Sequence, residues 1–316
     1  MNITLLDSET LGDKLDFSLL ETFGNVTVYS HTDPEQVAER IENADIIIIN
    51  KVKINKENLV KAKNLKLICL FATGYDNVNL DHCREKGIGV CNVKGYSTDS
   101  VAQLTVAMAL QLACRIPEYT HYVNTGAYTK SGMSNYLEPF YYELAGKTWG
   151  IIGLGNIGKK VAKVAEALGC TVVVNKRTPV SDYENLSVDD LCKCADIISL
   201  HTPLTPETKG LIGKKQLDLM KNTAILINVA RGAVTDEVEV AQAVLNKKIG
   251  GFATDVYSTE PLCENHPFNK IMGMKNVCLT PHMGWGAYEA RVRCLNEIIK
   301  NITSFINGEK RNRVDL

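Results

Sequence analysis

Short apolar runs alternate with longer mixed stretches through the first part of the chain, and this alternation predicts an α/β fold. Continuous runs of Val, Ile and Leu are typical of strands that are buried on both faces of a parallel sheet. The mixed stretches at 33–42 and 56–63 carry apolar residues at helical spacing, so we expect helices there. The predicted strands lie at residues 2–6, 26–29, 45–49, 67–71 and 88–92.

The same signature returns in the second part of the chain, which indicates a second, doubly wound sheet. One long helix begins at a cap within 97–100 and runs to about residue 116, and an amphipathic helix covers 287–306. Between 118 and 143 the aromatic residues are scattered without a period, so we expect an arm or a partner surface there. The predicted strands lie at 148–152, 171–175, 196–200, 224–228, 251–255 and 277–280.

Residues 148–158 are predicted to form a strand, a glycine-rich turn and the start of a helix. Gly153 permits the tight turn, Gly155 lets a pyrophosphate approach bare backbone, and Gly158 lets the helix pack close to the strand. The N-terminus of such a helix offers free N–H groups to an anion. We therefore expect a dinucleotide at this turn, and the alternative is a purely structural glycine turn.

Composition favours a small-molecule enzyme. The chain has 316 residues, about right for two domains, and a formal net charge of -1 with no long basic run. Neither a nucleic acid nor an anionic membrane surface is therefore an expected partner. The N-terminus lacks a signal peptide and no apolar run approaches the ~20 residues of a membrane helix, so we expect a cytoplasmic protein.

The ten cysteines do not suggest a metal site. Most lie in apolar segments, where a reduced cysteine packs as a small hydrophobic residue. The one close pair, Cys192 and Cys194, has the wrong spacing for a zinc knuckle and no partner pair or nearby histidine. We expect ordinary thiols and no bound metal.

Further motifs follow the glycine turn in a recognisable order. The chain resembles the D-isomer-specific 2-hydroxyacid dehydrogenase family over essentially its whole length, and several motifs in the family's order are far more specific than one. The motifs are Ala72–Val78, the glycine turn, Asn228–Gly232 with Thr235–Glu237, Asp255–Tyr257 with Glu260-Pro261, and Pro281–Gly284.

The resemblance implies a Rossmann-type doubly wound parallel sheet inserted in a smaller flavodoxin-like α/β substrate domain. Residues 1–98 and 287–316 would form the substrate domain, and residues 99–286 the dinucleotide-binding domain. Hydride transfer between a nicotinamide ring and a 2-oxo acid would take place in the cleft between them. The resemblance also implies a homodimer, with the helix after residue 98 and the aromatic segment 119–142 as the interface.

Three side chains fit the chemistry of that reaction. Arg231 offers a planar pair of donors for the substrate carboxylate and carbonyl, although such a residue can also be a surface ion pair. His282 is of the residue type best suited to donate a proton in such a reaction, although most lone histidines are structural. Glu260 would bond the far ring nitrogen of His282 and stabilise the imidazolium. The resemblance assigns all three as catalytic.

The resemblance also implies residues that contact cofactor and substrate. Asp255 matches the residue that holds the nicotinamide carboxamide, and its alternative is a strand-end cap. Gly74 belongs to a loop whose amides contact the substrate carboxylate, and its alternative is an ordinary turn. Lys51 faces the same ligand or is simply solvated. The further cofactor residues are Val101, Asn156, Ile157, His201, Thr202, Pro203, Val229 and Ala230, and the further substrate residues are Thr73, Tyr75 and Trp285.

The chain departs from the family pattern after the predicted strand 171–175. An acidic residue usually bonds the adenosine ribose there, but this chain has Lys176, Arg177 and Thr178. These side chains can attract a 2′-phosphate that a carboxylate would repel, so NADPH is favoured over NADH as the NAD(P)H cofactor. The alternative is that both basic side chains point to solvent and NADH is used.

Gln103 and Trp285 resemble the hydroxypyruvate reductase, or glycerate dehydrogenase, branch of the family. That branch reduces small polar 2-oxo acids such as hydroxypyruvate and glyoxylate. The alternatives are a dehydrogenase for D-lactate, another D-2-hydroxy acid or phosphoglycerate, and a dinucleotide-sensing binding protein like the family's corepressors. The phosphoglycerate alternative is weakened because no regulatory domain follows before Leu316.

Overall fold

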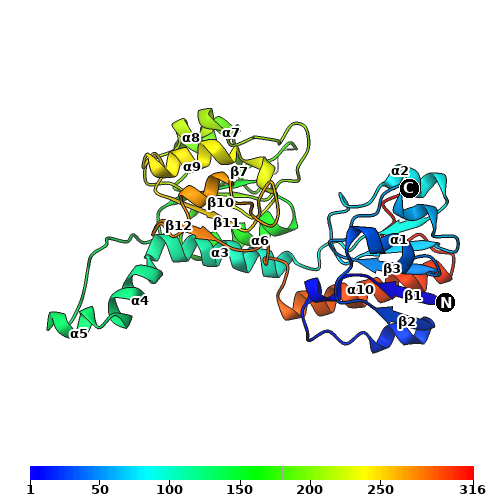
Figure 1. Ribbon diagram of the computed structural model, residues 1–316. Coiled ribbons are helices and arrows are strands. Elements are labelled where there is room, and N and C mark those ends of the chain that lie inside the picture. The colour runs from blue at the N-terminus through cyan, green and yellow to red at the C-terminus, as the bar shows by residue number, and fades with distance from the viewer. Residues whose placement is uncertain (179–180) are drawn as a thin grey trace. The chain divides into compact units, whose positions relative to one another are not determined.

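A computed structural model describes residues 1–178 and 181–316, and these fold into two compact units (Figure 1). The first unit is Met1–Ser97 with Trp285–Leu316, and the second is Thr98–Gly284. Each unit has its own parallel sheet, five-stranded in the first and seven-stranded in the second. The predicted fold class, two α/β domains with parallel sheets, is confirmed.

The five-stranded sheet has the order β2-β1-β3-β4-β5, which is the flavodoxin-like order. Every neighbouring pair is parallel. The strands begin and end within about two residues of the predicted ranges. They are β1 (Asn2–Leu5), β2 (Asn25–Val28), β3 (Ile46–Ile49), β4 (Leu67–Leu70) and β5 (Gly89–Cys91).

The apolar run of β3 shows why these strands have unbroken runs of apolar residues. Ile46 and Ile48 belong to the core on one face, where the C-terminal helix α10 (Tyr288–Ile306) packs, and Ile47 and Ile49 to the core on the other. Both faces of the sheet are therefore buried, as a strand period of two requires. Helices α1 (Val37–Arg40) and α2 (Leu80–Glu85) lie over that second face.

Two of the helices predicted in this unit, 33–42 and 56–63, are shorter than expected. Within 56–63 only the 3₁₀ turn η4 (Asn58–Val60) forms, so that prediction was wrong. The side chains of Asn55 and Asn58 each accept the other's backbone N–H at 3.0 Å, a local bond that competes with a helix. The predicted helix 33–42 consists of η3 (Pro34–Gln36) and α1. Two more 3₁₀ turns are η1 (Ser8–Leu11) and η2 (Ser18–Phe23).

The seven-stranded sheet has the order β12-β11-β10-β9-β6-β7-β8. The chain leaves β6 toward β7 on one side and returns to β9 on the other, which is the topological switch point of a Rossmann-type sheet. The two-residue strand β8 was not predicted. The strands are β6 (Thr148–Ile152), β7 (Thr171–Asn175), β8 (Glu184–Asn185), β9 (Ile197–Leu200), β10 (Ile225–Asn228), β11 (Gly251–Thr254) and β12 (Val277–Leu279).

Helices cover both faces of this sheet (Figure 1). On one face α3 (Thr98–Cys114) packs with α6 (Asn156–Ala167), and the core there includes Trp149 and Ile151. The other face carries α7 (Val188–Cys194), α8 (Lys214–Leu219) and α9 (Glu237–Leu245). The short turns η5 (Gly232–Val234) and η6 (Pro267–Lys270) flank α9 and β12.

The aromatic segment forms an arm with two helices that the sequence pattern did not predict. After α3 the chain turns at Arg115, which has a left-handed φ of 55°, and continues as α4 (Ile116–Asn124) and α5 (Ala127–Ser131). None of the residues of α4 or α5 is buried. No described helix is long and apolar enough to span a membrane.

Candidate active site

The predicted site residues of the second unit share one edge of its sheet. Gly153 follows β6, His201 follows β9, Arg231 follows β10, Asp255 follows β11 and His282 comes after β12. All of these strands are parallel, so the loops leave from the same, carboxyl edge. Ligands of open α/β sheets bind at this edge, near the switch point.

The three glycines of the turn have different surroundings. A Cβ built on Gly153, whose φ is +96°, would lie 2.7 Å from the His201 carbonyl carbon, and one on Gly158 would lie 2.3 Å from the Gly153 oxygen. Both glycines are therefore required by packing. A Cβ on Gly155 would meet no protein atom within 4 Å. A side chain there would fill only the space over the N-terminus of α6, so the turn fits a bound pyrophosphate.

The basic cluster lies directly after β7. Lys176 is half-buried, its backbone N–H donates to Asn185 Oδ1 at 2.9 Å, and Arg177 and Thr178 are exposed. The pKa of the exposed Glu207 carboxyl is lowered by the Thr205 hydroxyl, by a backbone N–H and, more weakly, by the charge of Arg177. Arg177 thus has an acidic neighbour, contributed by the loop after β9.

His201 sits in a buried hydrogen-bond chain. The Trp149 indole N–H donates to Ser199 Oγ at 3.0 Å, and Ser199 Oγ lies 3.0 Å from His201 Nε2. Indole is only a donor, so the serine proton is free to donate to Nε2. Burial lowers the pKa of His201 to about 3. The ring is therefore neutral, and its Nδ1 is a buried atom without a hydrogen-bond partner among the described residues.

His282 and Glu260 form a pair. His282 Nδ1 lies 2.6 Å from Glu260 Oε2, and the Tyr257 N–H donates to Glu260 Oε1 at 3.0 Å. The side chains are 27% and 31% exposed, so ligands can reach them. A carboxylate acceptor places a proton on Nδ1, which leaves Nε2 as the ring position that exchanges a proton with a ligand. The sequence analysis predicted this pairing.

Asp255 clamps the loop that carries His282. Its carboxylate accepts the Thr280 hydroxyl at 2.6 Å, the Met283 N–H at 2.8 Å and the Gly284 N–H at 2.7 Å. The residue is 3% exposed, and burial raises the pKa of its carboxyl while these donors oppose the rise. These contacts make Asp255 a cap of this loop, and its contact with a nicotinamide carboxamide stays a prediction.

Arg231 lies in a loop that is held by its own neighbours. The buried Asn228 side chain accepts the Ala230 N–H at 3.1 Å and donates to the Arg231 carbonyl at 3.0 Å. Nη1 of Arg231 donates to the Ala230 carbonyl at 2.8 Å. A guanidinium has five donors, so the others can still bind a carboxylate.

The first unit places its predicted ligand residues at the carboxyl edge of its own sheet. Lys51 follows β3, and Thr73, Gly74 and Tyr75 follow β4. The Thr73 hydroxyl donates to the Val93 carbonyl at 2.7 Å, and Tyr75 is 40% exposed. Trp285 packs partly against the core that contains α10.

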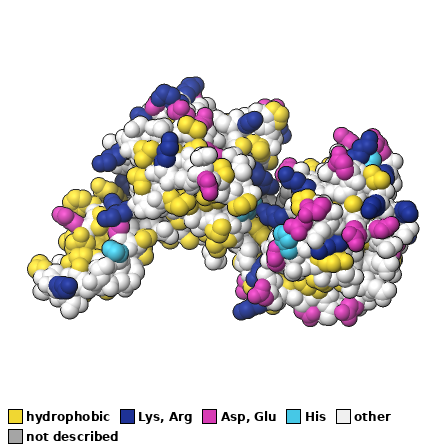
Figure 2. Space-filling model, in the orientation of Figure 1, with side chains coloured by type: hydrophobic (Ala, Val, Ile, Leu, Met, Phe, Trp, Pro, Cys, Tyr) yellow, Lys and Arg dark blue, Asp and Glu magenta, His cyan; other side chains and the backbone are white. Residues whose placement is uncertain are grey.

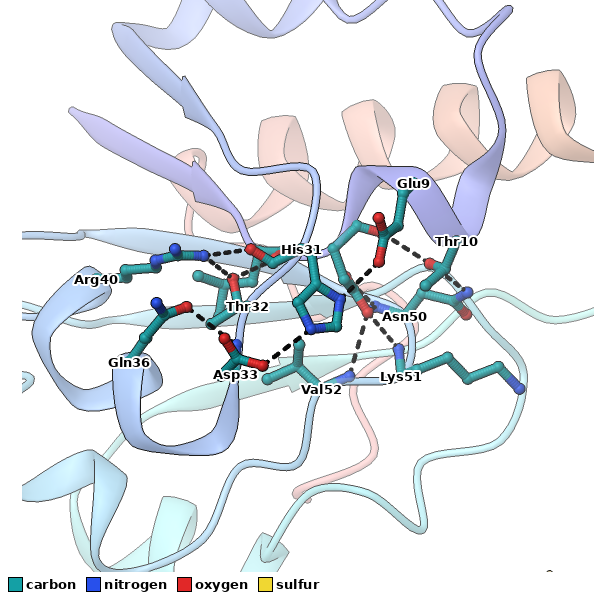
Figure 3. Close-up of polar contacts among 12 residues, drawn as sticks. Glu9, Thr10, His31, Thr32, Asp33, Gln36, Arg40, Asn50, Lys51 and Val52 are labelled. Carbon is teal, nitrogen blue, oxygen red and sulfur yellow. Dashed lines mark hydrogen bonds and ion pairs between the residues drawn. The ribbon is translucent and has the colours of Figure 1, made fainter. Parts of the chain in front are cut away.

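Asp7 holds the Lys51 loop and was missed by the sequence analysis. Its carboxylate accepts the N–H groups of Asn50, Lys51 and Val52 at 2.6–3.2 Å, and the Lys51 side chain points away from this cluster (Figure 3). Asp7 is 3% exposed, and burial raises the pKa of its carboxyl. An acidic residue directly after the apolar run 2–6 was the available signal.

Known proteins resemble the whole chain. Residues 106–284 match the family described as D-isomer specific 2-hydroxyacid dehydrogenase, NAD binding domain. A hydroxypyruvate reductase of Blautia hydrogenotrophica is 35% identical over 100% of both chains. A glycerate dehydrogenase of Methylorubrum extorquens is 36% identical over 89% of each. The solved structure of the TT0316 protein from Thermus thermophilus is 34% identical, with a TM-score of 0.89 over 99% of this chain and 100% of the other.

Proposed function

This chain belongs to the D-isomer specific 2-hydroxyacid dehydrogenase family, and from that premise we propose that it reduces hydroxypyruvate, or glyoxylate, to the D-2-hydroxy acid with His282 as proton donor. The family predicted from the sequence is confirmed. The chain is an oxidoreductase that uses a nicotinamide dinucleotide and acts on 2-oxo acids. The particular acid, the cofactor preference and the residue roles are our proposal.

The His282–Glu260 pair is the observation that supports this proposal most strongly. In the reductive direction His282 Nε2 gives its proton to the substrate carbonyl oxygen, and Glu260 stabilises the imidazolium before that transfer. Arg231 binds the substrate carboxylate with paired donors and orients the carbonyl. A bound nicotinamide dinucleotide supplies the hydride.

We assign the dinucleotide to the carboxyl edge of the seven-stranded sheet. Gly155, Asn156 and Ile157 at the start of α6 would bind the pyrophosphate with backbone N–H groups. Asp255 has capacity for one more donor on its two oxygens, which suits a nicotinamide carboxamide. Val101, His201, Thr202, Pro203, Val229 and Ala230 would line the remainder of the cofactor site.

The cofactor is NADPH rather than NADH in this proposal. Lys176 and Arg177 provide two positive charges at the end of β7, and the exposed Thr178 adds a hydroxyl donor. Glu207 reduces the attraction of Arg177 for a phosphate, because it is an acidic neighbour. Both basic side chains contribute to the preference for a 2′-phosphate in this proposal.

The substrate is small and polar in this proposal. The two curated relatives described above are named for hydroxypyruvate and for glycerate, its reduced form. In the first unit, the amides of Thr73, Gly74 and Tyr75 are our candidates for contacts with the substrate carboxylate, and Lys51 and Trp285 are our candidates for contacts with the rest of the substrate. The Asp7 carboxylate keeps the Lys51 backbone in place, so the lysine side chain is free to contact a ligand.

A panel of 2-oxo acids assayed with both reduced cofactors tests the proposal. We expect NADPH oxidation with hydroxypyruvate and glyoxylate, and weaker activity with pyruvate and bulkier acids. Arg231→Ala, Glu260→Gln and His282→Ala should each lower kcat/KM tenfold or more, because each removes an interaction with the transition state. Near-normal turnover by His282→Ala would contradict the mechanism.

We also propose a homodimer in the cytoplasm. The arm 116–142 exposes large apolar side chains, among them Leu137 at 68% and Phe140 at 71%, and Figure 2 shows apolar side chains gathered over it. All ten cysteines are unpaired, as is usual for a reducing compartment. Sedimentation at micromolar concentration is the test: we expect a dimer, and Phe140→Ser with Leu137→Ser should shift it toward monomer.

A further inference from the structure

A buried glutamate joins two of the loops that carry the proposed catalytic residues. Glu237, at the first turn of α9, is 8% exposed. Its Oε1 accepts the Ser258 N–H at 2.8 Å and its Oε2 accepts the Ser258 hydroxyl. Glu237 begins the helix that follows the Arg231 loop, whereas Ser258 lies in the same loop as Glu260. The contact therefore spans the Arg231 and Glu260 loops.

The environment of Glu237 is built for an anion. His266 Nδ1 accepts the Phe268 N–H at 3.2 Å, so that nitrogen carries no proton and the ring proton is on Nε2. Nε2 lies 3.0 Å from Glu237 Oε2, although it is not aligned for a full hydrogen bond. A buried carboxylate is costly unless donors surround it; here the Ser258 N–H and hydroxyl donate to it, and the His266 ring lies close by.

Close backbone packing accompanies this contact. A Cβ built on Gly232 would lie 2.0 Å from the Tyr257 carbonyl carbon and 2.2 Å from the Ser258 nitrogen. The Arg231 loop and the Glu260 loop therefore touch directly. Glu237 hydrogen-bonds to Ser258 at this same contact, and we call the contact of Gly232 and Glu237 with Tyr257 and Ser258 the seam. On its other side the Glu260 loop is tied to the His282 loop, because the Tyr257 hydroxyl donates to the Thr280 carbonyl at 2.9 Å.

We propose that Glu237 and Ser258 are positioning residues that hold the Arg231 loop at a fixed distance from the Glu260–His282 pair. The inference rests on the proposed function, since it concerns the alignment of a carboxylate-binding guanidinium with a proton donor. Neither residue is among those proposed to touch the substrate. Misplacement of reacting groups by about 1 Å lowers rates by as much as 10²-fold, so a bond at this seam affects turnover.

The test compares Glu237→Gln with Glu239→Gln. Glu239 lies in the same first turn and outside the seam, so the control makes the same change of charge. The amide of Glu237→Gln can present an NH₂ group to the Ser258 N–H and hydroxyl, which are donors themselves. We expect kcat/KM for hydroxypyruvate to fall 10- to 100-fold, mainly in kcat, and this loss should exceed any change in the Kd for NADPH because the glycine turn is untouched. Glu239→Gln should keep wild-type kinetics.

Variants of Ser258 provide a second test. Ser258→Ala removes only the hydroxyl, so it decides the question even where Glu237→Gln does not fold, and Ser258→Thr should restore activity. The double variant Glu237→Gln/Ser258→Ala should lose no more than Glu237→Gln alone, because both act on one contact. Full kcat in Glu237→Gln and Ser258→Ala would overturn the inference. His282→Ala separates the hypotheses: if it is inactive while both seam variants are active, only the positioning role fails.

Discussion

Alanine at Gly158 tests how tightly the glycine turn is packed. The new Cβ would lie 2.3 Å from the Gly153 oxygen and 3.2 Å from Ile151 Cγ2. Since non-bonded heavy atoms prefer about 3.5 Å, the backbone must move by about 1 Å. Overpacking of this kind costs about 1–3 kcal/mol, and each kcal/mol lowers the melting temperature of such a domain by about 2–4 °C. We expect Gly158→Ala to be less stable with and without cofactor.

Alanine at Gly155 should instead leave the free protein unchanged. Gly155 has an ordinary φ of -84°, and its Cβ would meet no protein atom within 4 Å. The free energy of unfolding should therefore stay within about 0.5 kcal/mol of wild type. A dinucleotide at one hundred times its Kd stabilises the wild type by about 2.7 kcal/mol, and a tenfold weaker Kd removes about 1.4 kcal/mol of that gain.

Thermal unfolding with and without NADPH, together with calorimetric titration, measures both effects. Trp149 is buried in the second unit, so its fluorescence in a Trp285→Phe background reports the unfolding of that unit. The two glycine variants should therefore give opposite outcomes. NADPH binding by Gly155→Ala as tight as that of wild type would contradict this, because the pyrophosphate then does not lie over residue 155.

Three further predictions concern the same edge of the sheet. Lys176→Ala should lower kcat/KM with NADPH tenfold or more and leave NADH within twofold; an equal loss with both cofactors would contradict a phosphate contact. Gly232→Ala should lower kcat, since its Cβ would overlap the Tyr257 backbone, and wild-type turnover would argue against the seam. The folded pKa of His201, about 3, lies below its unfolded value of about 6.5, so between these pH values only the unfolded chain binds the proton. Stability should be complete above pH 6.5 and fall by up to about 1.4 kcal/mol per pH unit on acidification; urea unfolding at pH 7 and 4.5 should show a weaker dependence for His201→Gln.

The strands and the motifs were the parts of this protein that could be predicted from the sequence. The strand 171–175 was predicted with its observed ends, because a strand buried on both faces has an unmistakable apolar run. The lengths of the short helices of the first unit were not predicted. Local side-chain hydrogen bonds such as those of Asn55 and Asn58 end a helical stretch, but they do not change the spacing of its apolar residues. The strand β8 has only Glu184 and Asn185, which carry no apolar signal.

The active-site pair could be predicted, whereas the contacts that Asp7 and Glu237 make with distant loops could not. His282 and Glu260 stand in recognisable motifs. Asp7 acts on a loop 43 to 45 positions further along the chain, and Glu237 acts on Ser258, 21 positions away. Such pairs depend on which loops the folded sheets bring together. The pattern of residues along a single sequence does not show which distant loops will meet.

Buried carboxylates accept loop N–H groups at the carboxyl edges of both sheets. Loops that leave the ends of parallel strands have backbone N–H groups without a ladder partner, and an unpaired N–H is costly once it is buried. Asp7, Asp255 and Glu237 each accept such N–H groups, and each is at most 8% exposed. Hydrogen bonds to a charged acceptor are stronger than neutral ones, which offsets the desolvation of the carboxylate. The loops of Lys51, His282 and Glu260 are thereby held by the backbone, so their functional side chains remain available to ligands.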